Sequence, residues 1–260
     1  MVAGDTMRLL SAVLALGFAT AAAQAPAPSP SPFPLAPPAG PQIMPTPLDD
    51  SDTGFVPIFD GKSLDGWEGD SRYWRVENGE IVGEVTPATL LKQNNFLIWR
   101  GGQPANFELK VQFRISAQGN SGINYRSEEF PGTRYLLRGY QGDIDGANRY
   151  TGQNYEERKR TFLAPRGSIT YVATGQKPAI IAQIGSADDL KQYVKNGDWN
   201  EYHIIARGNV LIHILNGHIM CEVIDDDTEN RKMSGLIGVQ VHVGPPMKIE
   251  YRSMLLKQLP

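Results

Sequence analysis

Residues 107–116, Phe-Glu-Leu-Lys-Val-Gln-Phe-Arg-Ile-Ser, alternate strictly between apolar and polar side chains. A period of two is typical of a β-strand that has one face in the core and the other toward solvent. A second strong signal is Asn78-Gly79, a dipeptide typical of a two-residue hairpin turn. Strands are therefore predicted on both sides of it, at residues 73–77 and 80–84.

The C-terminal part of the chain repeats this pattern. Three apolar runs separated by turns that contain Gly and Asn predict an antiparallel meander, at residues 202–206, 210–215 and 218–223. Two more strands are expected at residues 236–243 and 248–256. One short helix is expected between Ser186, an N-cap residue, and Asn196-Gly197. About a dozen strands and one short helix predict an all-β fold, an antiparallel β-sandwich or jelly roll.

Composition restricts the partners that the protein can have. The chain has 260 residues, and its 25 Lys and Arg against 28 Asp and Glu argue against a nucleic-acid-binding protein. The single cysteine, Cys221, excludes an intramolecular disulfide and a cysteine-rich zinc site. No apolar run after residue 25 approaches the roughly 20 residues that cross a bilayer, so no membrane span is expected there.

The first fifth of the chain has a different composition from the rest. Arg8 precedes an apolar run at residues 9–19, and Ala23-Gln24-Ala25 fits a cleavage site, so residues 1–25 are predicted to be a signal peptide. The alternative is an N-terminal anchor that is not cut. Residues 26–53 are rich in Pro and Ala and predict a disordered linker, followed by one folded domain at residues 54–258. A secreted or periplasmic location is expected.

Polar and glycine residues gather at positions 119–158 and again near the C-terminus. If Ile123 and Tyr125 face the core, strand alternation places the residues between them on the other face. The same argument applied to three strands predicts a cleft floor that contains Asn124, Arg126, Gln141, Asp143, Asp145, Gln240 and His242. Amide, carboxylate and guanidinium groups of this kind match sugar hydroxyls and carbonyl oxygens.

Several of these residues also have ordinary structural interpretations. Asp143 and Asp145 lie beside glycines and could belong to turns or hold a Ca²⁺ ion through their oxygens. Residues 156–160 form a charged run, which is usually a solvated face. His242 ends a predicted strand beside Gly244 and two prolines, which favours a functional role.

Five short blocks, read in order, resemble a known family. They are residues 57–67 (PIFDGKSLDGW), 74–81 (WRVENGEI), 120–123 (NSGI), 199–202 (WNEY) and 238–242 (GVQVH). The chain is similar over residues 54–258 to the 3-keto-disaccharide hydrolase family, also called domain of unknown function 1080. The resemblance implies a jelly roll of the concanavalin-A-like lectin/glucanase superfamily, found mostly in exported bacterial proteins. It also implies cleavage of glycosides that carry a ketone at carbon 3. One departure is that the chain lacks the family's usual glutamate beside Tyr140.

A ketone at carbon 3 makes the hydrogen on carbon 2 acidic. A base can then remove that proton, the leaving group departs from carbon 1 by elimination, and water adds afterwards, so that the net reaction is hydrolysis. This route needs a base, a group that stabilises the enolate, and an acid. The expected catalytic residues are His242 and Asp143 as bases and Arg126, or a divalent cation, as the stabilising group. The expected substrate-binding residues are Asn124, Gln141, Asp145, Tyr155, Glu156, Arg158 and Gln240.

Two other functions remain open at this point. One is an ordinary glycoside hydrolase on the same sandwich, with its two carboxyl groups among Asp143, Asp145, Glu156 and Glu157. The other is a carbohydrate-binding module without catalysis. In all three cases the expected partner is a small glycoside or an oligosaccharide.

Export can be tested at the N-terminus. If the signal peptide is cut, protein recovered from its native compartment should begin near Gln24 or Pro26, because Ala-x-Ala sites are cleaved after the second alanine. Edman sequencing or mass spectrometry measures this directly. A mature protein that still begins at Met1 or Met7 would contradict the prediction.

Overall fold

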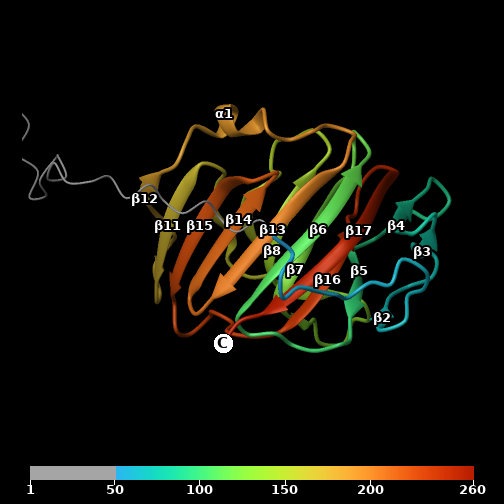
Figure 1. The fold of residues 1–260 in the computed structure, drawn as a ribbon, viewed down its shortest axis with the longest axis horizontal. Helices are drawn as coiled ribbons and strands as arrows, with labels where there is room; N and C mark the ends of the chain where they lie inside the picture. Colours follow the sequence, from blue (N-terminus) through green and yellow to red (C-terminus); the bar gives the residue numbers. More distant parts are fainter. Residues whose placement is uncertain (1–50) are drawn as a thin grey trace, which may run out of the picture. The chain divides into compact units, whose positions relative to one another are not determined.

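The computed structural model describes residues 51–260. The expected signal peptide, residues 1–25, and residues 26–50 of the expected linker lie outside this part. Within it, the strands form two sheets, with the larger in front and the smaller behind in Figure 1. No helix among the described residues is long and apolar enough to span a membrane.

The larger sheet has ten strands in the order β12-β11-β15-β14-β13-β6-β17-β4-β3, and β1 pairs with β17. Its strands are β1 (Val56–Pro57), β3 (Trp74–Glu77), β4 (Glu80–Val85), β6 (Phe107–Ile115), β11 (Ser168–Ala173), β12 (Ala179–Gln183), β13 (Asn200–Arg207), β14 (Val210–Leu215), β15 (His218–Asp226) and β17 (Met247–Gln258). Among the described strand pairs, all are antiparallel except β11 with β15. The predicted hairpin is β3–β4 and the predicted meander is β13–β14–β15.

The smaller sheet has seven strands in the order β10-β9-β8-β7-β16-β5-β2, all antiparallel. They are β2 (Trp67–Glu68), β5 (Asn95–Trp99), β7 (Asn120–Glu129), β8 (Leu137–Asp145), β9 (Asn154–Glu157), β10 (Thr161–Ala164) and β16 (Leu236–Val241). The helix α1 (Ala187–Lys191) is shorter than expected, but it begins as predicted, because Ser186 Oγ accepts the N–H of Asp189. The predicted all-β sandwich is confirmed.

One core fills the space between the two sheets. Apolar residues of β6, such as Leu109 and Phe113, pack in the same cluster as Ile123 and Tyr125 of β7. The alternation at residues 107–116 therefore marks a strand with one face in the core, as predicted, because the apolar positions of β6 are all buried. The opposite face of the seven-stranded sheet turns away from this core. It carries polar side chains, and a separate small apolar cluster is formed by Phe96, Ile98, Leu136 and Leu137.

Four polar side chains are buried inside the sandwich and bond to one another. The hydroxyl of Tyr125 lies 3.0 Å from His213 Nε2 and accepts a hydrogen bond from Asn154 Nδ2 at 2.9 Å. On the other side of the ring, the Tyr202 hydroxyl lies 3.1 Å from His213 Nδ1. Burial lowers the pKa of His213 to about 4, so its imidazole is neutral near pH 7. This cluster satisfies polar groups in the core and lies on the far side of β8 from the outer face.

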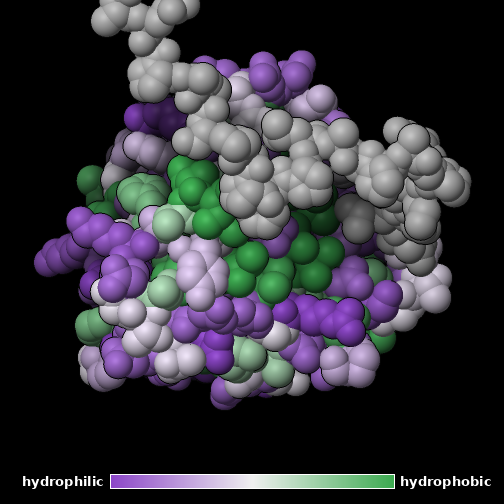
Figure 2. Space-filling model, turned by 90° about the vertical axis from the view of Figure 1, so that its left-hand side faces the viewer, coloured by the Kyte–Doolittle hydropathy of each residue, from purple (hydrophilic) through white to green (hydrophobic). Residues whose placement is uncertain are grey.

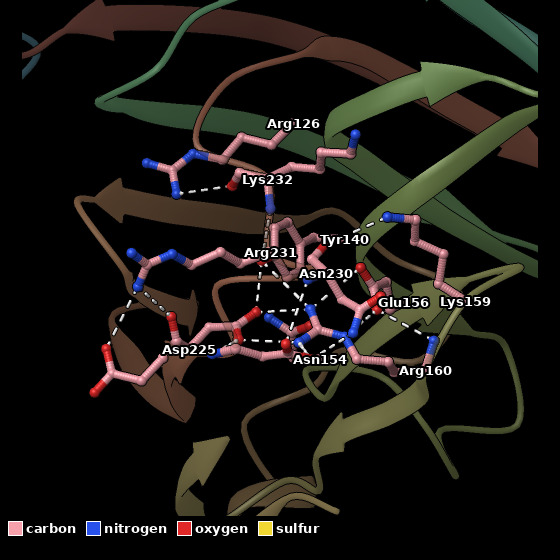
Figure 3. A network of polar contacts seen from close by, with 12 residues as sticks. Arg126, Tyr140, Asn154, Glu156, Lys159, Arg160, Asp225, Asn230, Arg231 and Lys232 are labelled. Carbon is pink, nitrogen blue, oxygen red and sulfur yellow. Dashed lines mark hydrogen bonds and ion pairs between the residues drawn. The ribbon is translucent and has the colours of Figure 1, made fainter. Parts of the chain in front are cut away.

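A second buried network anchors the turn between β9 and β10. The guanidinium of Arg160 donates to Glu156 Oε2 at 2.6 Å and to Asp225 Oδ2 at 2.7 Å, and it also pairs with Asp227 at 3.2 Å. Tyr140 donates its hydroxyl to Asp225 at 2.6 Å (Figure 3). One arginine thus pairs with three carboxylates that are almost completely buried. The network joins β9 and β8 of one sheet to β15 of the other.

At one edge of the larger sheet, β12 pairs with a strand on one side only, among residues 51–260. Its isoleucines are exposed, Ile180 to 51% and Ile181 to 57%, and Ile184 follows at 38%. Figure 2, which looks at this side of the molecule, shows hydrophobic side chains gathered on the surface. This edge therefore presents backbone N–H and C=O groups, flanked by apolar side chains, to which another strand could pair.

The Arg160 network should be important for stability. Replacing Arg160 with Met leaves buried carboxylates without their partner. We therefore expect the free energy of unfolding to be about 3–5 kcal/mol lower than in the parent protein. Urea or thermal unfolding measures this difference. The control is Arg207→Met at an exposed position, where a change within about 0.5 kcal/mol is expected. Equal stability of the two variants would contradict the stabilising role of the network.

Candidate active site

The outer face of the seven-stranded sheet brings together polar residues from neighbouring strands. In the register of β7 with β8, Gly122 lies opposite Asp143 and Asn124 lies opposite Gln141. In the register of β8 with β9, Gln141 lies opposite Tyr155. Residues that face each other in this way share one side of a sheet. The polar side chains thus form adjacent rows, as strand alternation predicted.

A pocket with a volume of about 260 Å³ opens on this face. Its walls come from β7, β8, β9 and β10 and from the segments next to β5 and β16. The lining residues are Asn94, Asn120, Gln141, Asp143, Tyr150, Tyr155, Glu157, Phe162 and His242.

Asp143 is the most strongly perturbed acid in the pocket. Its side chain accepts hydrogen bonds from Gln141 Nε2 at 2.7 Å and from Gln153 Nε2 at 2.8 Å, and the residue is only 8% exposed. Burial raises its pKa to about 7, and the nearby charge of Glu157 acts in the same direction, while the two amide hydrogen bonds oppose the shift. Near neutral pH the carboxyl group therefore exists in both protonation states and can take up or release a proton.

Glu157 provides a second buried carboxyl group. Asn94 Nδ2 donates to it at 3.2 Å and Gln240 Nε2 at 3.4 Å. Burial is the main cause that raises the pKa of Glu157. Its contact with Asn94 is informative, because three strands separate β9 from β5 and flat strands lie about 4.8 Å apart. Asn94 lies just before β5 and also accepts the backbone N–H of Val243 at 3.0 Å, so this segment reaches across the face of the sheet to the pocket.

His242 stands at the mouth of the pocket. Its Nδ1 lies 2.6 Å from the carbonyl oxygen of Val243, a contact in which Nδ1–H donates to the backbone. This assignment leaves Nε2 free of that bond, so Nε2 is the ring nitrogen that can exchange a proton with a ligand. The structure thus supplies two buried carboxyl groups and one imidazole around a single cavity.

Aromatic rings form one wall. Phe162 packs edge-on against Tyr155 at 5.1 Å between ring centres and lies 6.2 Å from Tyr150. Phe162 is 53% exposed and Tyr150 is 38% exposed. Exposed rings beside polar groups suit a ligand that has both C–H faces and hydroxyl groups.

Gly122 is required for the arrangement of the pocket floor. A Cβ at this position would lie within 2.4–2.7 Å of three atoms of Gln141. The missing side chain lets Gln141 lie across β7, where its amide also accepts from Gln240 Nε2 at 3.2 Å. Gln141 can therefore bond to Asp143 on one side and to Gln240 on the other.

The structure brings some expected site residues together. Gln141, Asp143, Tyr155 and His242 line the pocket, and Gln240 is buried where it contacts Gln141 and Glu157. Their chemical roles are taken up below as proposals.

Two expected residues lie on this face but outside the pocket lining. Asn124 is fully buried and donates weakly to Ser127 Oγ at 3.4 Å. Asp145 accepts the backbone N–H groups of Ala147 and Arg149, so the turn interpretation is the right one for this residue. Asp145 instead lines a neighbouring hollow.

The expected place of Arg126 in the cleft floor is wrong. Its guanidinium is buried and donates to the backbone carbonyl groups of Ala105, Gly208 and Lys232. The cause is a break in strand alternation, since the β7–β8 register shifts after Tyr125 and Arg126 has a φ of 44°. Arg126 therefore holds loops together and is not placed to stabilise an enolate in this pocket.

The prediction for the acidic pair of β9, Glu156 and Glu157, is wrong, because the two side chains lie on the opposite sides of the sheet from those expected. Glu156, an expected substrate-binding residue, points into the sandwich and bonds to Arg160. Its neighbour Glu157, treated as part of a solvated run, is the one that lines the pocket. Alternation from Tyr155 would have identified Glu157. Arg158 is exposed, lies outside the pocket lining, and has its Nε 3.7 Å from Glu157 Oε1.

Of the other pocket residues, Asn120 lies in the block at residues 120–123, whereas Asn94, Tyr150 and Phe162 were not expected in the site. For a metal, the residues described here offer no group of three or more His, Cys, Asp or Glu side chains. The expected divalent cation thus stays a hypothesis without such a ligand set.

Comparison with known proteins agrees with the resemblance read from the sequence blocks. A 3-keto-disaccharide hydrolase from Bacteroides thetaiotaomicron is 33% identical over 90 residues, which make up 29% of this chain and 28% of that protein. The match thus spans little more than a quarter of that relative's length.

Two solved structures have a similar fold. A candidate glycosyl hydrolase from Parabacteroides distasonis ATCC 8503 has a TM-score of 0.54 at 16% identity, covering 79% of this chain and 99% of that chain. A Bacillus subtilis protein with a galectin-like fold has a TM-score of 0.50 at 13% identity, covering 75% of this chain and 90% of that chain. At these identities the likeness concerns the fold alone.

A family model, the 3-keto-alpha-glucoside-1,2-lyase-like domain, matches residues 54–257. This range includes all of the blocks on which the resemblance was based, together with every residue of the pocket. The chain therefore belongs to the family of 3-keto-alpha-glucoside-1,2-lyase-like domains.

Proposed function

We propose that this protein is an exported enzyme that cleaves 3-keto-glycosides by elimination followed by hydration, with net hydrolysis. Membership of the family supports the substrate class, and residues 1–25 support export. The single observation that carries the mechanism is Asp143, a carboxyl group buried in a pocket of amides and aromatic rings with a pKa of about 7. A base works best when its pKa lies near the working pH.

In the first step the Asp143 carboxylate removes the proton from carbon 2 of the bound ring. The electrons of that C–H bond form an enolate, whose negative charge lies on the oxygen at carbon 3. The enolate then collapses, a double bond forms between carbons 1 and 2, and the bond from carbon 1 to the leaving oxygen breaks. His242, which starts the step protonated on both ring nitrogens, gives its Nε2 proton to this oxygen, so that an alcohol departs and a neutral imidazole with its proton on Nδ1 is left.

Water completes the reaction. Its oxygen bonds to carbon 1, and the Asp143 carboxyl group, whose proton has exchanged with solvent after the leaving group departs, gives a proton to carbon 2, which regenerates the carboxylate. The second proton of the water restores His242.

The enolate that forms in the first step must be stabilised by hydrogen bonds to its oxygen. Because Arg126 lies elsewhere, we assign this role to the amide groups of Asn94 and Asn120, which line the pocket.

A second candidate is an ordinary glycoside hydrolase. The observation that favours it is that two carboxyl groups, Asp143 and Glu157, line the same pocket, as acid and nucleophile or base do in such enzymes. A pure binding module would use the same aromatic wall without turnover. The fate of the hydrogen on carbon 2 separates these possibilities.

We expect the protein to cleave 3-keto-trehalose but not trehalose. In heavy water the released 3-keto sugar should carry deuterium at carbon 2, because elimination removes that proton and hydration replaces it from solvent. Mass spectrometry and NMR of the product measure this. Cleavage of plain trehalose would favour the ordinary hydrolase, and binding without turnover would favour the module.

Asp143→Asn should lower kcat by about 10²–10⁴-fold, since a positioned base contributes about that much, while substrate binding changes less. In the parent enzyme kcat/KM should rise as the pH rises through about 7, because the base must lose its proton first. The matched control is Asp189→Asn at an exposed position of α1, which should keep full activity. Full activity of Asp143→Asn, with no deuterium in the product, would rule out this mechanism.

A further inference from the structure

A second hollow, of about 520 Å³, adjoins the pocket and has no role in the steps above. Its walls come from the loop at residues 117–119, the turn at residues 145–149 and the segment at residues 242–247. It shares Asn120 and His242 with the inner pocket. The two cavities are therefore neighbours, and the residue that we assign as the acid for the leaving group lies in the wall of both.

The lining of this outer hollow is mixed in character. Val243, Pro245 and Met247 supply apolar surface, whereas Gln118 and Asn120 supply amides. Arg149 adds a guanidinium group, but its charge is offset by Asp145, whose Oδ2 lies 3.4 Å from Arg149 Nε. Such a surface suits an uncharged molecule that has both apolar C–H faces and hydroxyl groups.

The turn that forms one wall is held in place before any ligand arrives. The Asp145 carboxylate accepts the backbone N–H groups of Ala147 at 3.0 Å and Arg149 at 2.8 Å. Arg166 Nη1 donates to Asn148 Oδ1 at 3.0 Å, and Asn148 Nδ2 donates to the Lys191 carbonyl. The hollow is thus built by fixed hydrogen bonds, which lowers the entropic cost of binding there.

We propose that the inner pocket holds the 3-keto ring and that the outer hollow binds the leaving group, a second sugar or a similar uncharged polyhydroxyl group. This inference rests on the proposed function and deepens it. The inner pocket lies just below the range of about 300–1,000 Å³ usual for larger ligands and suits one ring. A disaccharide that extends through both cavities places its bridging oxygen beside His242.

Ala147→Trp tests the inference, because Ala147 is exposed at the wall of the outer hollow and only its backbone N–H is used by Asp145. The indole should fill the hollow. We expect kcat/KM for 3-keto-trehalose to fall about ten-fold or more, while that for methyl 3-keto-glucoside, with its small leaving group, changes less than about two-fold. Ala179→Trp, the same change at an exposed position of β12 outside both cavities, is the matched control and should leave both values unchanged. Equal effects of Ala147→Trp on the two substrates, or no effect on either, would overturn the inference.

A binding measurement keeps this test separate from the proposed function. In Asp143→Asn labelled at methionine methyl groups, the Met247 resonance, assigned with Met247→Leu, reports on the outer hollow. It should shift with 3-keto-trehalose and not with methyl 3-keto-glucoside. If the parent protein cleaves neither sugar, the proposed function fails, and this spectrum still decides whether a second sugar occupies the hollow. No selective shift would overturn the inference in either case.

Discussion

Asp143 holds a carboxyl group almost entirely out of water, on the face of the smaller sheet that lies outside the core. Among residues 51–260, two amide donors, from Gln141 and Gln153, offset the loss of hydration, and they do not restore its usual acidity. The group is therefore a base that is available near pH 7. Its charged form lowers the stability of the folded protein, because a buried charge has lost its hydration. A site of this kind can persist only if the surrounding fold is rigid enough to hold the carboxyl group in its buried position.

Three features of the chain supply that rigidity. Gly122 leaves room for Gln141 to lie flat across β7, so the donor stays beside Asp143. The segment just before β5 brings Asn94 to Glu157 across three intervening strands. The Arg160 network fixes the turn after β9, and with it the strand that carries Tyr155 and Glu157 (Figure 3). The outer hollow then extends the same face toward the loops at the strand ends, where His242 lies between the two cavities.

Regular local patterns predicted the fold, because alternation at residues 107–116 and the turn at Asn78-Gly79 report directly on strands and their pairing. The same alternation placed Gln141 and Asp143 on one face. It failed where the backbone is irregular, since the bulge after Tyr125 turns Arg126 into the interior. Asn94 and Phe162 reach the pocket from separate parts of the chain, and no local signal in the sequence reports such a meeting.

The claim on which the account depends most is that burial gives Asp143 a pKa near neutrality. It can be measured in the free protein by following the ¹³C resonance of its carboxyl group through a pH titration, with Asp143→Asn to assign the signal. The account predicts a midpoint at about pH 7. A midpoint near 3.8, the ordinary value for aspartate, would show that water reaches the carboxyl group freely and would contradict its role as the base.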